Sequence, residues 1–487
     1  MCAQFNLTRE VIKIKGFIVT MTIEKKLLNI QLIAKTKEPL YRQIADGITR
    51  AIEQGDIAIR EKLPTHRALA DQLQVTVGTV TRAYAEAERR HLVEARIGAG
   101  TYVCDNNKNH HWIYQLEELQ TEECNFGYNI PPRFDRSEMI SNAMAKISAN
   151  PSQLNDMMLY QPPQGIDNHR HIVCQWLNQK GIDVSSEQMY FTSGAQHAAE
   201  LLLSIFCRAG DTVLVEQFCY PGFLTLARQH GITLKSVEMD EDGVLPASLA
   251  SACELYQPRL IYLTPTQQNP TSVTMPLSRR EDVISVCREH NVLIAEDDVN
   301  GLLPPSPPPP LINLAPEHVI HIGGLSKCLA PGLRLGYIQV PKQWQQHLSA
   351  ALYNHSLMIS PLLSAIACEL IVHGDADRVL TTVRTEIQQR QLLVQQYLGE
   401  FAITTQTYSF HVWLQLPEDW RLSDFIAATT ARGVIVKSAE LFTPRGNHIQ
   451  PAVRLAISSP LNQQQLIFGL KTIAELLRHP PLSHFSL

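Results

Sequence analysis

The chain has 487 residues, of which 45% are hydrophobic and 18% are charged, and its net charge is −5. A single hydrophobic core stops growing near roughly 250 to 300 residues, so this length predicts at least two domains. The negative net charge excludes a protein that coats nucleic acid or anionic membrane over its whole surface, and any such binding must be local.

The cysteines and the longest apolar runs exclude two further classes. Ten cysteines are scattered singly without a CxxC pair, which indicates neither a disulfide framework nor a metal site. No apolar stretch approaches the roughly 20 residues that span a bilayer. We therefore expect a cytoplasmic protein with no membrane segment and no bound metal.

Residues 1–35 form an N-terminal extension to which we assign no function. After it, apolar residues recur at helical spacing in three short segments, the first of which carries Ile44 and Ile48. Thr65 and Thr76 stand just before the second and third segments, where a side-chain oxygen can cap a helix. The sequence therefore predicts three helices in tandem.

The stretch LVEARIGAGTYV, Leu92 to Val103, reads as two short alternating strands joined by a glycine-containing turn. Three helices and a hairpin predict a winged helix-turn-helix domain over residues 36–103. The run from PLYRQIADGITRAIEQ through LPTHRALADQLQVTVGTVTRAYAEAERRHL to the RIGAGTYV wing closely resembles the GntR-type DNA-binding domain.

That resemblance implies double-stranded operator DNA as a partner. The positions that match DNA-contacting residues of the family are Arg67, Thr76, Thr79, Thr81, Arg96 and Gly98. Each threonine has a helix cap or a solvated helix face as its alternative role. Val77 stands where the family often has a base-reading arginine, so the resemblance does not carry over an operator sequence.

Residues 104–123 are polar and predict a linker. In residues 124–487, near-continuous apolar strands alternate with amphipathic helices, which predicts an α/β domain with a largely parallel, buried sheet and a small C-terminal subdomain. The expected strands include MYFTSG, DTVLVEQ, RLIYLTP, VLIAEDD and HVIHIGG.

Polar residues follow four of these strands. FTSGAQ opens a helix after one strand, Asn269 in QQNPT and Asp297 in AEDD follow two others, and Lys327 in GGLSK follows the last. Ligands of such sheets bind at the carboxyl ends of the strands. The order resembles the fold-type I, aspartate-aminotransferase-like family of pyridoxal phosphate proteins, and with the front module it resembles the MocR-type regulators.

The resemblance implies pyridoxal 5'-phosphate as the cofactor. Lys327 matches the catalytic lysine that bonds to the cofactor aldehyde, and burial beside positive charge would activate its amine. Asp297 matches the carboxylate that keeps the ring nitrogen protonated. Asn269 matches the residue that hydrogen-bonds the ring hydroxyl, and Tyr220 matches the aromatic residue that stacks on the ring.

The phosphate and the carboxylate of an incoming amino acid are expected at two other places. The phosphate-binding positions by resemblance are Ser193, Gly194, Ala195, Gln196, Ser326 and Arg334. Arg454 in AVRLAIS matches the arginine that grips the carboxylate. Taken singly, a lysine after glycines can be a surface charge and an aspartate can be a helix cap. The occurrence of all these residues in the order of the family favours the cofactor site instead.

Four positions depart from the family pattern. Asn300 stands where a tyrosine is common, Gly324 where a phosphate-binding hydroxyl is common, Ser272 replaces a glycine and Cys328 replaces a threonine. One neutral hydrogen bond contributes about 0.5 to 1.5 kcal/mol, so each departure weakens cofactor binding without abolishing it. These losses should reduce catalytic turnover more than they reduce cofactor binding.

We therefore expect a homodimeric, pyridoxal phosphate-dependent transcriptional regulator that senses the cofactor or an amine effector. Weak transaminase activity is compatible with this expectation. One alternative is a working aminotransferase with an accessory DNA-binding module, and another is a regulator that no longer binds cofactor. The intact winged helix favours the regulator over the first alternative. Lys327, Asp297, Asn269 and Arg334 favour it over the second.

Overall fold

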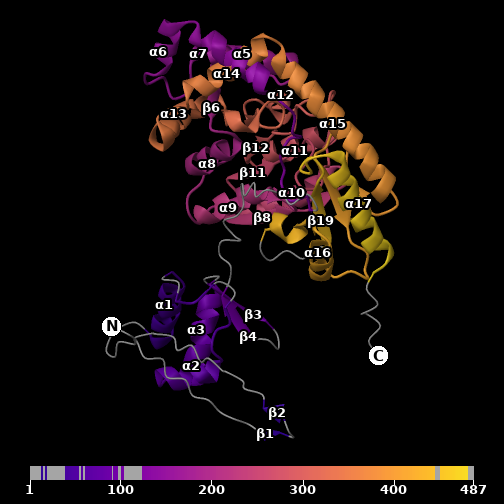
Figure 1. Ribbon diagram of the computed structural model, residues 1–487. Coiled ribbons are helices and arrows are strands. Elements are labelled where there is room, and N and C mark those ends of the chain that lie inside the picture. Colours follow the sequence, from indigo (N-terminus) through magenta and orange to yellow (C-terminus); the bar gives the residue numbers. More distant parts are fainter. Residues whose placement is uncertain are drawn as a thin grey trace. The chain divides into compact units, whose positions relative to one another are not determined.

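The computed structural model describes residues 13–14, 17–18, 39–53, 56–58, 61–89, 92–96, 100–103, 123–444 and 450–480. The chain divides into two compact units, residues 1–119 and 120–487 (Figure 1). Of the expected extension, only the paired two-residue strands β1 (Lys13–Ile14) and β2 (Phe17–Ile18) are described before Pro39. The expected linker lies outside the described residues apart from Glu123.

The first unit contains the three expected helices and the hairpin. Its elements are α1 (Leu40–Glu53), α2 (His66–Leu73), α3 (Val77–Arg89), β3 (Val93–Arg96) and β4 (Gly100–Val103), and the two strands pair antiparallel. Ile44, Ile48, Leu69 and Val80 are buried together in its core. Thr65 caps α2, since its hydroxyl accepts a hydrogen bond from the Ala68 N–H at 3.3 Å.

The second unit is built on a seven-stranded sheet. The strand order is β6 (Met189–Thr192), β14 (Gly336–Gln339), β13 (Val319–Gly324), β12 (Leu293–Asp297), β11 (Leu260–Leu263), β7 (Thr212–Glu216) and β8 (Thr233–Val237). All neighbours are parallel except β14, which runs antiparallel to both β13 and β6. The prediction of a largely parallel sheet is confirmed, whereas β14 was not among the expected strands.

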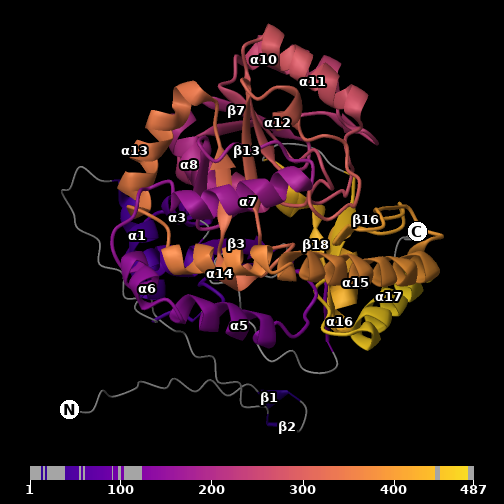
Figure 2. The ribbon, with the colours of Figure 1, turned by 90° about the horizontal axis from the view of Figure 1, so that it is seen from above.

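Helices cover both faces of this sheet, because successive strand residues point to opposite sides. Tyr262 of β11 packs in the cluster that includes α8 (Ala195–Phe206), α9 (Pro221–Gln229) and α13 (Gln345–Ser356). Its neighbour Leu263 packs in the cluster on the other face (Figure 2). The helices of that face are α5 (Ser137–Ser148), α6 (Pro151–Met157), α7 (Asp167–Gln179), α10 (Pro246–Tyr256), α11 (Leu277–Glu289), α12 (Leu311–Leu314) and α14 (Pro361–Val372).

The C-terminal part forms the small subdomain that the sequence predicts. It contains α15 (Asp375–Leu398), β15 (Ile403–Thr404), β16 (His411–Gln415), α16 (Leu422–Ala431), β17 (Val434–Ile435), β18 (Lys437–Ser438), β19 (Ala452–Ala456) and α17 (Gln463–Arg478). Its antiparallel sheet has the order β15-β16-β19-β18, and β17 pairs with β5 (Cys124–Asn125). Val412 and Val453 on one sheet face pack under α16 and α17.

Short elements complete the unit. They are β9 (Met239–Asp240), β10 (Gly243–Val244) and the 3₁₀ turns η1 (Pro331–Leu333), η2 (Lys342–Trp344) and η3 (Ala439–Phe442). Across the described ranges no single helix is long and apolar enough to cross a membrane, although the bent pair Lys342–Ser356 and Pro361–Val372 passes a test of length and composition across a 117° bend.

Candidate cofactor site

The expected site residues meet at the carboxyl edge of the seven-stranded sheet. Asp297 ends β12, Lys327 follows β13 and Asn269 follows β11, while Ser193 follows β6 on the far side of β14. Parallel strands bring their carboxyl ends to one edge, which is where a ligand binds in sheets of this kind. Arg454 reaches this edge from β19 of the small subdomain.

Lys327 is a partly buried lysine with no carboxylate bonded to it in the described structure. Its Nζ donates a hydrogen bond to the backbone oxygen of Asn129 and lies 5.8 Å from the centre of the Phe410 ring. Burial, with a smaller contribution from Arg454, lowers the pKa of Lys327 from 10.5 to about 7, although Asp297 opposes the shift. The amine is therefore a competent nucleophile near neutral pH.

Asp297 is buried and hydrogen-bonded. Its Oδ2 accepts a hydrogen bond from the Tyr262 hydroxyl and its Oδ1 accepts one from the Val299 N–H at 3.3 Å. Tyr262 stacks on Phe223, with ring centres 3.8 Å apart. Burial raises the pKa of Asp297, whereas the Tyr262 hydrogen bond holds it down. This carboxylate can pair with a protonated ring nitrogen.

The expected phosphate loop forms a corner between β6 and β14. Gly194 has a φ of +88°, and a Cβ built there would lie 2.8 Å from the Arg334 guanidinium. A Cβ on Gly336 would lie 2.7 Å from the Gly194 carbonyl carbon. The Arg334 guanidinium donates to the Ser193 oxygen at 3.3 Å. The corner thus presents a guanidinium and the unpaired N–H groups of a helix start to an anion.

The rest of this corner is polar. Ala195 and Gln196 begin α8, and the side-chain amide of Gln196 donates to the Gly222 oxygen at 3.4 Å. The Tyr220 ring lies against the same glycine, since a Cβ there would approach it within 2.4 Å. Ser326 is partly buried one residue before the lysine.

Arg454 and Asn269 are paired with each other. Arg454 donates from one terminal nitrogen to Asn269 Oδ1 at 3.2 Å and from the other to the Gly127 oxygen at 2.7 Å. Burial lowers the pKa of Arg454 to about 10. Its Nε has no acceptor among the described residues. The arginine is therefore held in place while one donor stays available.

Unpaired polar atoms around Lys327 provide a test of whether a cofactor fits. Buried atoms without a partner in the described ranges include Asn129 Oδ1, Gln196 Oε1, Asn300 Oδ1, Arg454 Nε and both ring nitrogens of His411. Native proteins leave few such atoms, and a ligand is one explanation of a cluster of them. An amine for the aldehyde, a carboxylate for the ring nitrogen and an anion corner for the phosphate all lie here, so the residues fit pyridoxal 5'-phosphate.

Three of the expected departures can be followed in the structure. The Asn300 side-chain amide donates to the Gln267 oxygen at 2.8 Å, so its nitrogen is already engaged. A Cβ on Gly324 would have no atom nearer than 3.9 Å, so this position offers space rather than a hydroxyl. Ser272 has a structural role instead, because its hydroxyl donates to the His411 oxygen at 3.0 Å.

Sequence reasoning missed three residues of this edge: Tyr262, Asn129 and His411. Tyr262 pairs across strands with Ala295, two residues before Asp297, and so lies on the same sheet face as the aspartate. That relation could have been derived if the pairing of β11 with β12 had been predicted. Asn129 and His411 reach the site from segments far away in sequence, for which no local pattern exists.

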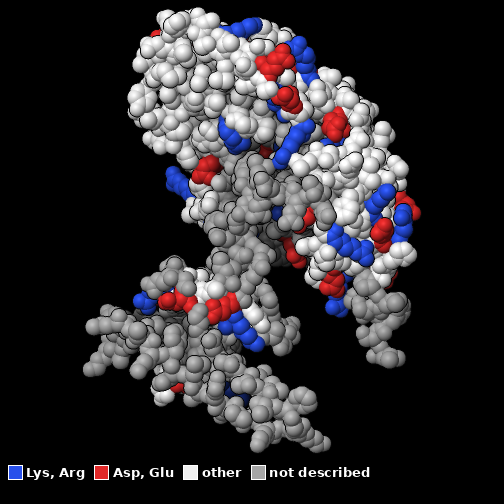
Figure 3. All heavy atoms as spheres, viewed as in Figure 1, with Lys and Arg blue, Asp and Glu red and all other residues white. Residues whose placement is uncertain are grey.

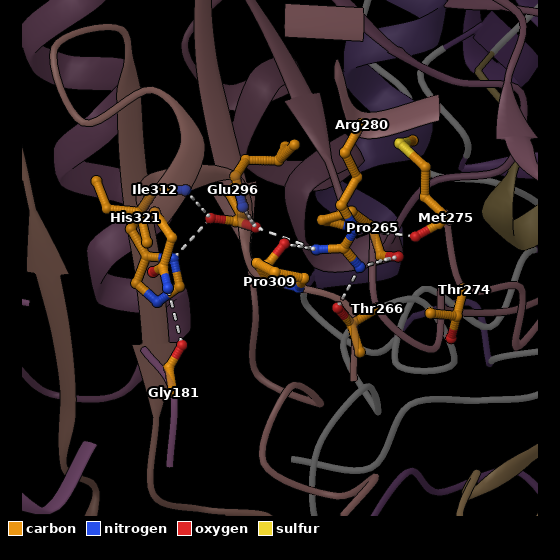
Figure 4. Close-up of polar contacts among 12 residues, drawn as sticks. Gly181, Pro265, Thr266, Thr274, Met275, Arg280, Glu296, Pro309, Ile312 and His321 are labelled. Atoms are coloured by element: carbon orange, nitrogen blue, oxygen red, sulfur yellow. Dashed lines mark hydrogen bonds and ion pairs between the residues drawn. The ribbon is translucent and has the colours of Figure 1, made fainter. Parts of the chain in front are cut away.

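A second polar cluster lies on the opposite face of the same strand ends (Figure 4). Arg280 is fully buried and donates to the backbone oxygens of Met275, Pro309 and Pro265 at 2.9 to 3.1 Å and to the Thr266 hydroxyl at 2.9 Å. Figure 4 shows the carboxylate of Glu296 between Arg280 and His321. This network contacts loops rather than the Lys327 edge.

Glu296 itself is well supplied with donors. It accepts hydrogen bonds from the Leu311 and Ile312 N–H groups at 2.6 and 3.0 Å, and its Oε2 lies 2.8 Å from His321 Nδ1. Burial opposes the charged forms, but their hydrogen bond raises the pKa of His321 and lowers that of Glu296. Among the described residues no group of three His, Cys, Asp or Glu side chains could hold a metal ion.

In the first unit, the expected DNA-contacting residues Arg67, Thr76 and Thr79 lie at the starts of α2 and α3. Arg67 is exposed. Thr76 caps α3 through the Thr79 N–H at 3.2 Å, and the Thr81 hydroxyl donates to the Val77 oxygen at 3.0 Å. Thr76 therefore has the helix-cap role named as an alternative, Thr81 lies on a solvated helix face, and both are exposed. Arg96 belongs to β3, and Gly98 lies outside the described residues.

Comparison with known proteins separates the chain into the same two parts. The family "Aminotransferase class I and II" matches residues 121–466, and the family "Bacterial regulatory proteins, gntR family" matches residues 40–103. The HTH-type transcriptional regulator YdeF of Bacillus subtilis is 29% identical over 446 residues, which cover 91% of this chain and 96% of that protein.

Aminotransferases match a smaller share of the chain. The 2-aminoadipate transaminase of Thermus thermophilus is 28% identical over 302 residues, covering 60% of this chain and 74% of that protein. The crystal structure of LysN, an α-aminoadipate aminotransferase from the same species in complex with N-(5'-phosphopyridoxyl)-L-leucine, has a TM-score of 0.67 at 24% identity and covers 77% of this chain and 96% of its own. That likeness shows a shared fold.

Proposed function

We propose that an amino compound bound beside Lys327 controls the binding of operator DNA by this chain, which belongs to the aminotransferase class I and II family and carries a GntR-family module before that domain. The chain is a transcriptional regulator fused to a pyridoxal phosphate domain of the aminotransferase type. Control requires the effector to bind two arrangements of the protein with different affinity, because equal binding shifts no equilibrium.

Pyridoxal 5'-phosphate supplies an aldehyde that a primary amine can attack. In our proposal Lys327 provides the resident amine, and because burial lowers its pKa to about 7, a substantial fraction is unprotonated at neutral pH. Asp297, oriented by Tyr262, holds the proton on the ring nitrogen. Arg334 and the start of α8 bind the phosphate, and Tyr220 and Asn269 contact the ring.

The observation that supports this proposal most is the coincidence of a lowered lysine pKa with unpaired polar atoms at one sheet edge. A surface lysine would keep an ordinary pKa, and a purely structural site would pair its buried atoms. Lys327 shows the lowered pKa, and Asn300 and Arg454 show the unpaired atoms. Both features are expected of a site that binds a ligand.

A working aminotransferase is the second candidate, because Lys327, Asp297 and Arg454 are all in place. Two observations disfavour it as the main function. The winged helix has no use in transamination, and Asn300 directs its amide to Gln267 rather than toward a ring oxygen. Weak turnover is compatible with the proposal.

We also propose a homodimer through the second unit, which would present two winged helices to two half-sites in the cytoplasm. Apolar side chains are exposed after α6 and on α13, among them Tyr160 at 82%, Met158 at 60% and Tyr353 at 58%. The two segments touch, since the Gln161 N–H lies 3.1 Å from Met358 Sδ. The surface over α6 and α13 carries few charged side chains (Figure 3). Such a patch is typical of a protein interface.

The cofactor part is tested by absorbance. The purified full chain incubated with pyridoxal phosphate should show the band of lysine-bound cofactor, and Lys327→Ala should lack it. Lys180→Ala is the matched control, because Lys180 is paired with Asp377 on a different surface. Identical spectra for wild type and Lys327→Ala would refute the assignment of Lys327.

The regulatory part is tested by DNA binding. Binding to the DNA upstream of its own gene should weaken steeply with salt, as expected when basic side chains displace counterions from phosphates. A panel of amino acids should change that affinity in the wild type and not in Lys327→Ala. Rapid transamination of the same panel, with no effect on DNA binding, would favour the aminotransferase instead.

A further inference from the structure

His411 is the most unusual polar residue near Lys327. It is 1% exposed, and neither nitrogen of its imidazole has a hydrogen-bond partner in the part of the chain that the structure describes. A buried polar group without a partner costs about 1 to 3 kcal/mol, so a ring that leaves both nitrogens unpaired calls for an explanation.

The backbone of His411 is firmly held, so the unpaired imidazole belongs to a residue with a fixed position in the sheet. Its N–H donates to Ser409 Oγ at 3.1 Å. Its oxygen accepts hydrogen bonds from the hydroxyls of Thr405 and Ser272 at 2.7 and 3.0 Å. Three side-chain hydroxyls therefore fix the backbone at this position, while the imidazole is left without any partner.

The register of the small sheet places this imidazole on the same face as Arg454. In the β16–β19 pair, His411 lies opposite Ala456 and Trp413 lies opposite Arg454. Paired residues and residues two apart share a sheet face, so His411, Trp413 and Arg454 all point the same way. The alternate residues Val412 and Leu455 pack in the core under α16 and α17.

The positive charges that act on His411 are those of Arg454 and Lys327. Burial lowers the pKa of His411 well below its usual value, and the next contributions come from Arg454 and then Lys327. Arg454 also lowers the pKa of Lys327. Arg454 and Lys327 thus supply positive charge that favours an anion, while burial and these two charges keep the His411 imidazole neutral.

Two unpaired donors suit the two oxygens of a carboxylate. Arg454 leaves its Nε–H free, and a neutral imidazole carries one N–H. By resemblance Arg454 holds the carboxylate of an amino acid, and we propose that His411 donates a second hydrogen bond to that carboxylate and so helps to select amino acids over simple amines. Lys327 Nζ lies 5.8 Å from the ring of Phe410, the residue before His411, and Lys327 acts electrostatically on His411, so a ligand whose amine and carboxylate share one carbon suits this site.

This inference rests on the proposed function, because it names the ligand class of the same site. The test uses the full chain loaded with pyridoxal phosphate and two probes, L-norvaline and butylamine, which differ only in the carboxylate. The change in cofactor absorbance on titration gives the affinity for each probe. The variants are His411→Phe, which removes both nitrogens, and His411→Gln, which keeps an N–H donor.

We expect His411→Phe to weaken L-norvaline binding by about tenfold or more, the usual effect of losing a hydrogen bond to a charged acceptor. Its affinity for butylamine should not change, and His411→Gln should regain part of the loss. His169→Gln, which alters another buried histidine bonded to Ser364 at 2.9 Å, should change neither affinity.

Two results would overturn the inference. An equal loss for both probes would make His411 structural, and no loss for either would mean that a water molecule alone pairs with the ring. A wild type that shows no lysine-bound cofactor would instead refute the proposed function. In that case, calorimetry can compare the binding of L-norvaline to cofactor-free wild type and to His411→Phe. Equal heats for the two proteins would contradict a contact between His411 and the carboxylate.

Discussion

The two polar clusters at the carboxyl ends of β11 and β12 differ in how completely their atoms are paired. Arg280 on one face donates to four acceptors, and Glu296 receives two backbone N–H groups and His321. On the other face, Arg454 keeps an unpaired Nε and His411 two unpaired nitrogens among the described residues. The paired cluster fixes loops, and the unpaired one is suited to a ligand. Arg280 and Glu296 therefore differ from Arg454 and His411 in hydrogen-bond pairing rather than in burial.

Breaking the paired cluster should have the largest effect on stability. Arg280→Met removes the cation and leaves Glu296 and four oxygens without it, so the free energy of unfolding should fall by about 3 to 5 kcal/mol. Urea unfolding followed by circular dichroism measures this change. The control is Arg279→Met. It removes a partly exposed ion pair with Asp240, so the free energy of unfolding should fall by about 1 kcal/mol or less. Equal losses for both variants would contradict the comparison.

The reactivity of Lys327 should depend on pH in the direction set by its lowered pKa. Because that pKa is about 7, the protonated fraction shrinks above pH 7, and the rate of covalent cofactor capture should rise roughly tenfold per pH unit up to about pH 7 and then level off. Stopped-flow absorbance at several pH values measures this rate. A rate that keeps rising to about pH 10 would show an ordinary lysine.

Tyr262→Phe tests a paired contact on the ligand face, the hydrogen bond from the Tyr262 hydroxyl to Asp297. Loss of the hydroxyl leaves Asp297 with the Val299 N–H as its hydrogen-bond donor, so its pKa should rise further and cofactor affinity should fall by about 1 to 3 kcal/mol. Fluorescence titration with pyridoxal phosphate measures the affinity. Tyr190→Phe, which removes a hydroxyl bonded to the Gln345 oxygen at 3.2 Å, should leave that affinity unchanged.

The smallest effect is expected for His411→Phe in the absence of ligand. The substitution removes no side-chain hydrogen bond found among the described residues, so the free energy of unfolding should change by less than about 1 kcal/mol, or increase. Thermal unfolding of the cofactor-free protein is sufficient to measure this. A loss as large as that of Arg280→Met would mean that the imidazole has a structural partner.

The sequence predicted the elements of both units and the strand ends that carry Lys327, Asp297 and Asn269, because these depend on local periodicity and on one edge rule for parallel sheets. It did not predict β14, whose antiparallel pairing with β6 and β13 joins segments far apart in the chain. It also missed His411, which becomes notable only when the β16–β19 register places it beside Arg454. Long-range pairing was the missing information in each case.

The contact between Gly336 and Gly194 has a genetic consequence. A side chain at position 336 would meet main-chain atoms of Gly194 and Ala195 at 2.7 to 2.9 Å, and main chain cannot turn aside as a flexible side chain can. In a screen of random codon changes for loss of the effector response, position 336 should therefore tolerate nothing but glycine. Substitutions of Gly336 should abolish the effector response as substitutions of Lys327 do, although Gly336 itself need not contact the ligand.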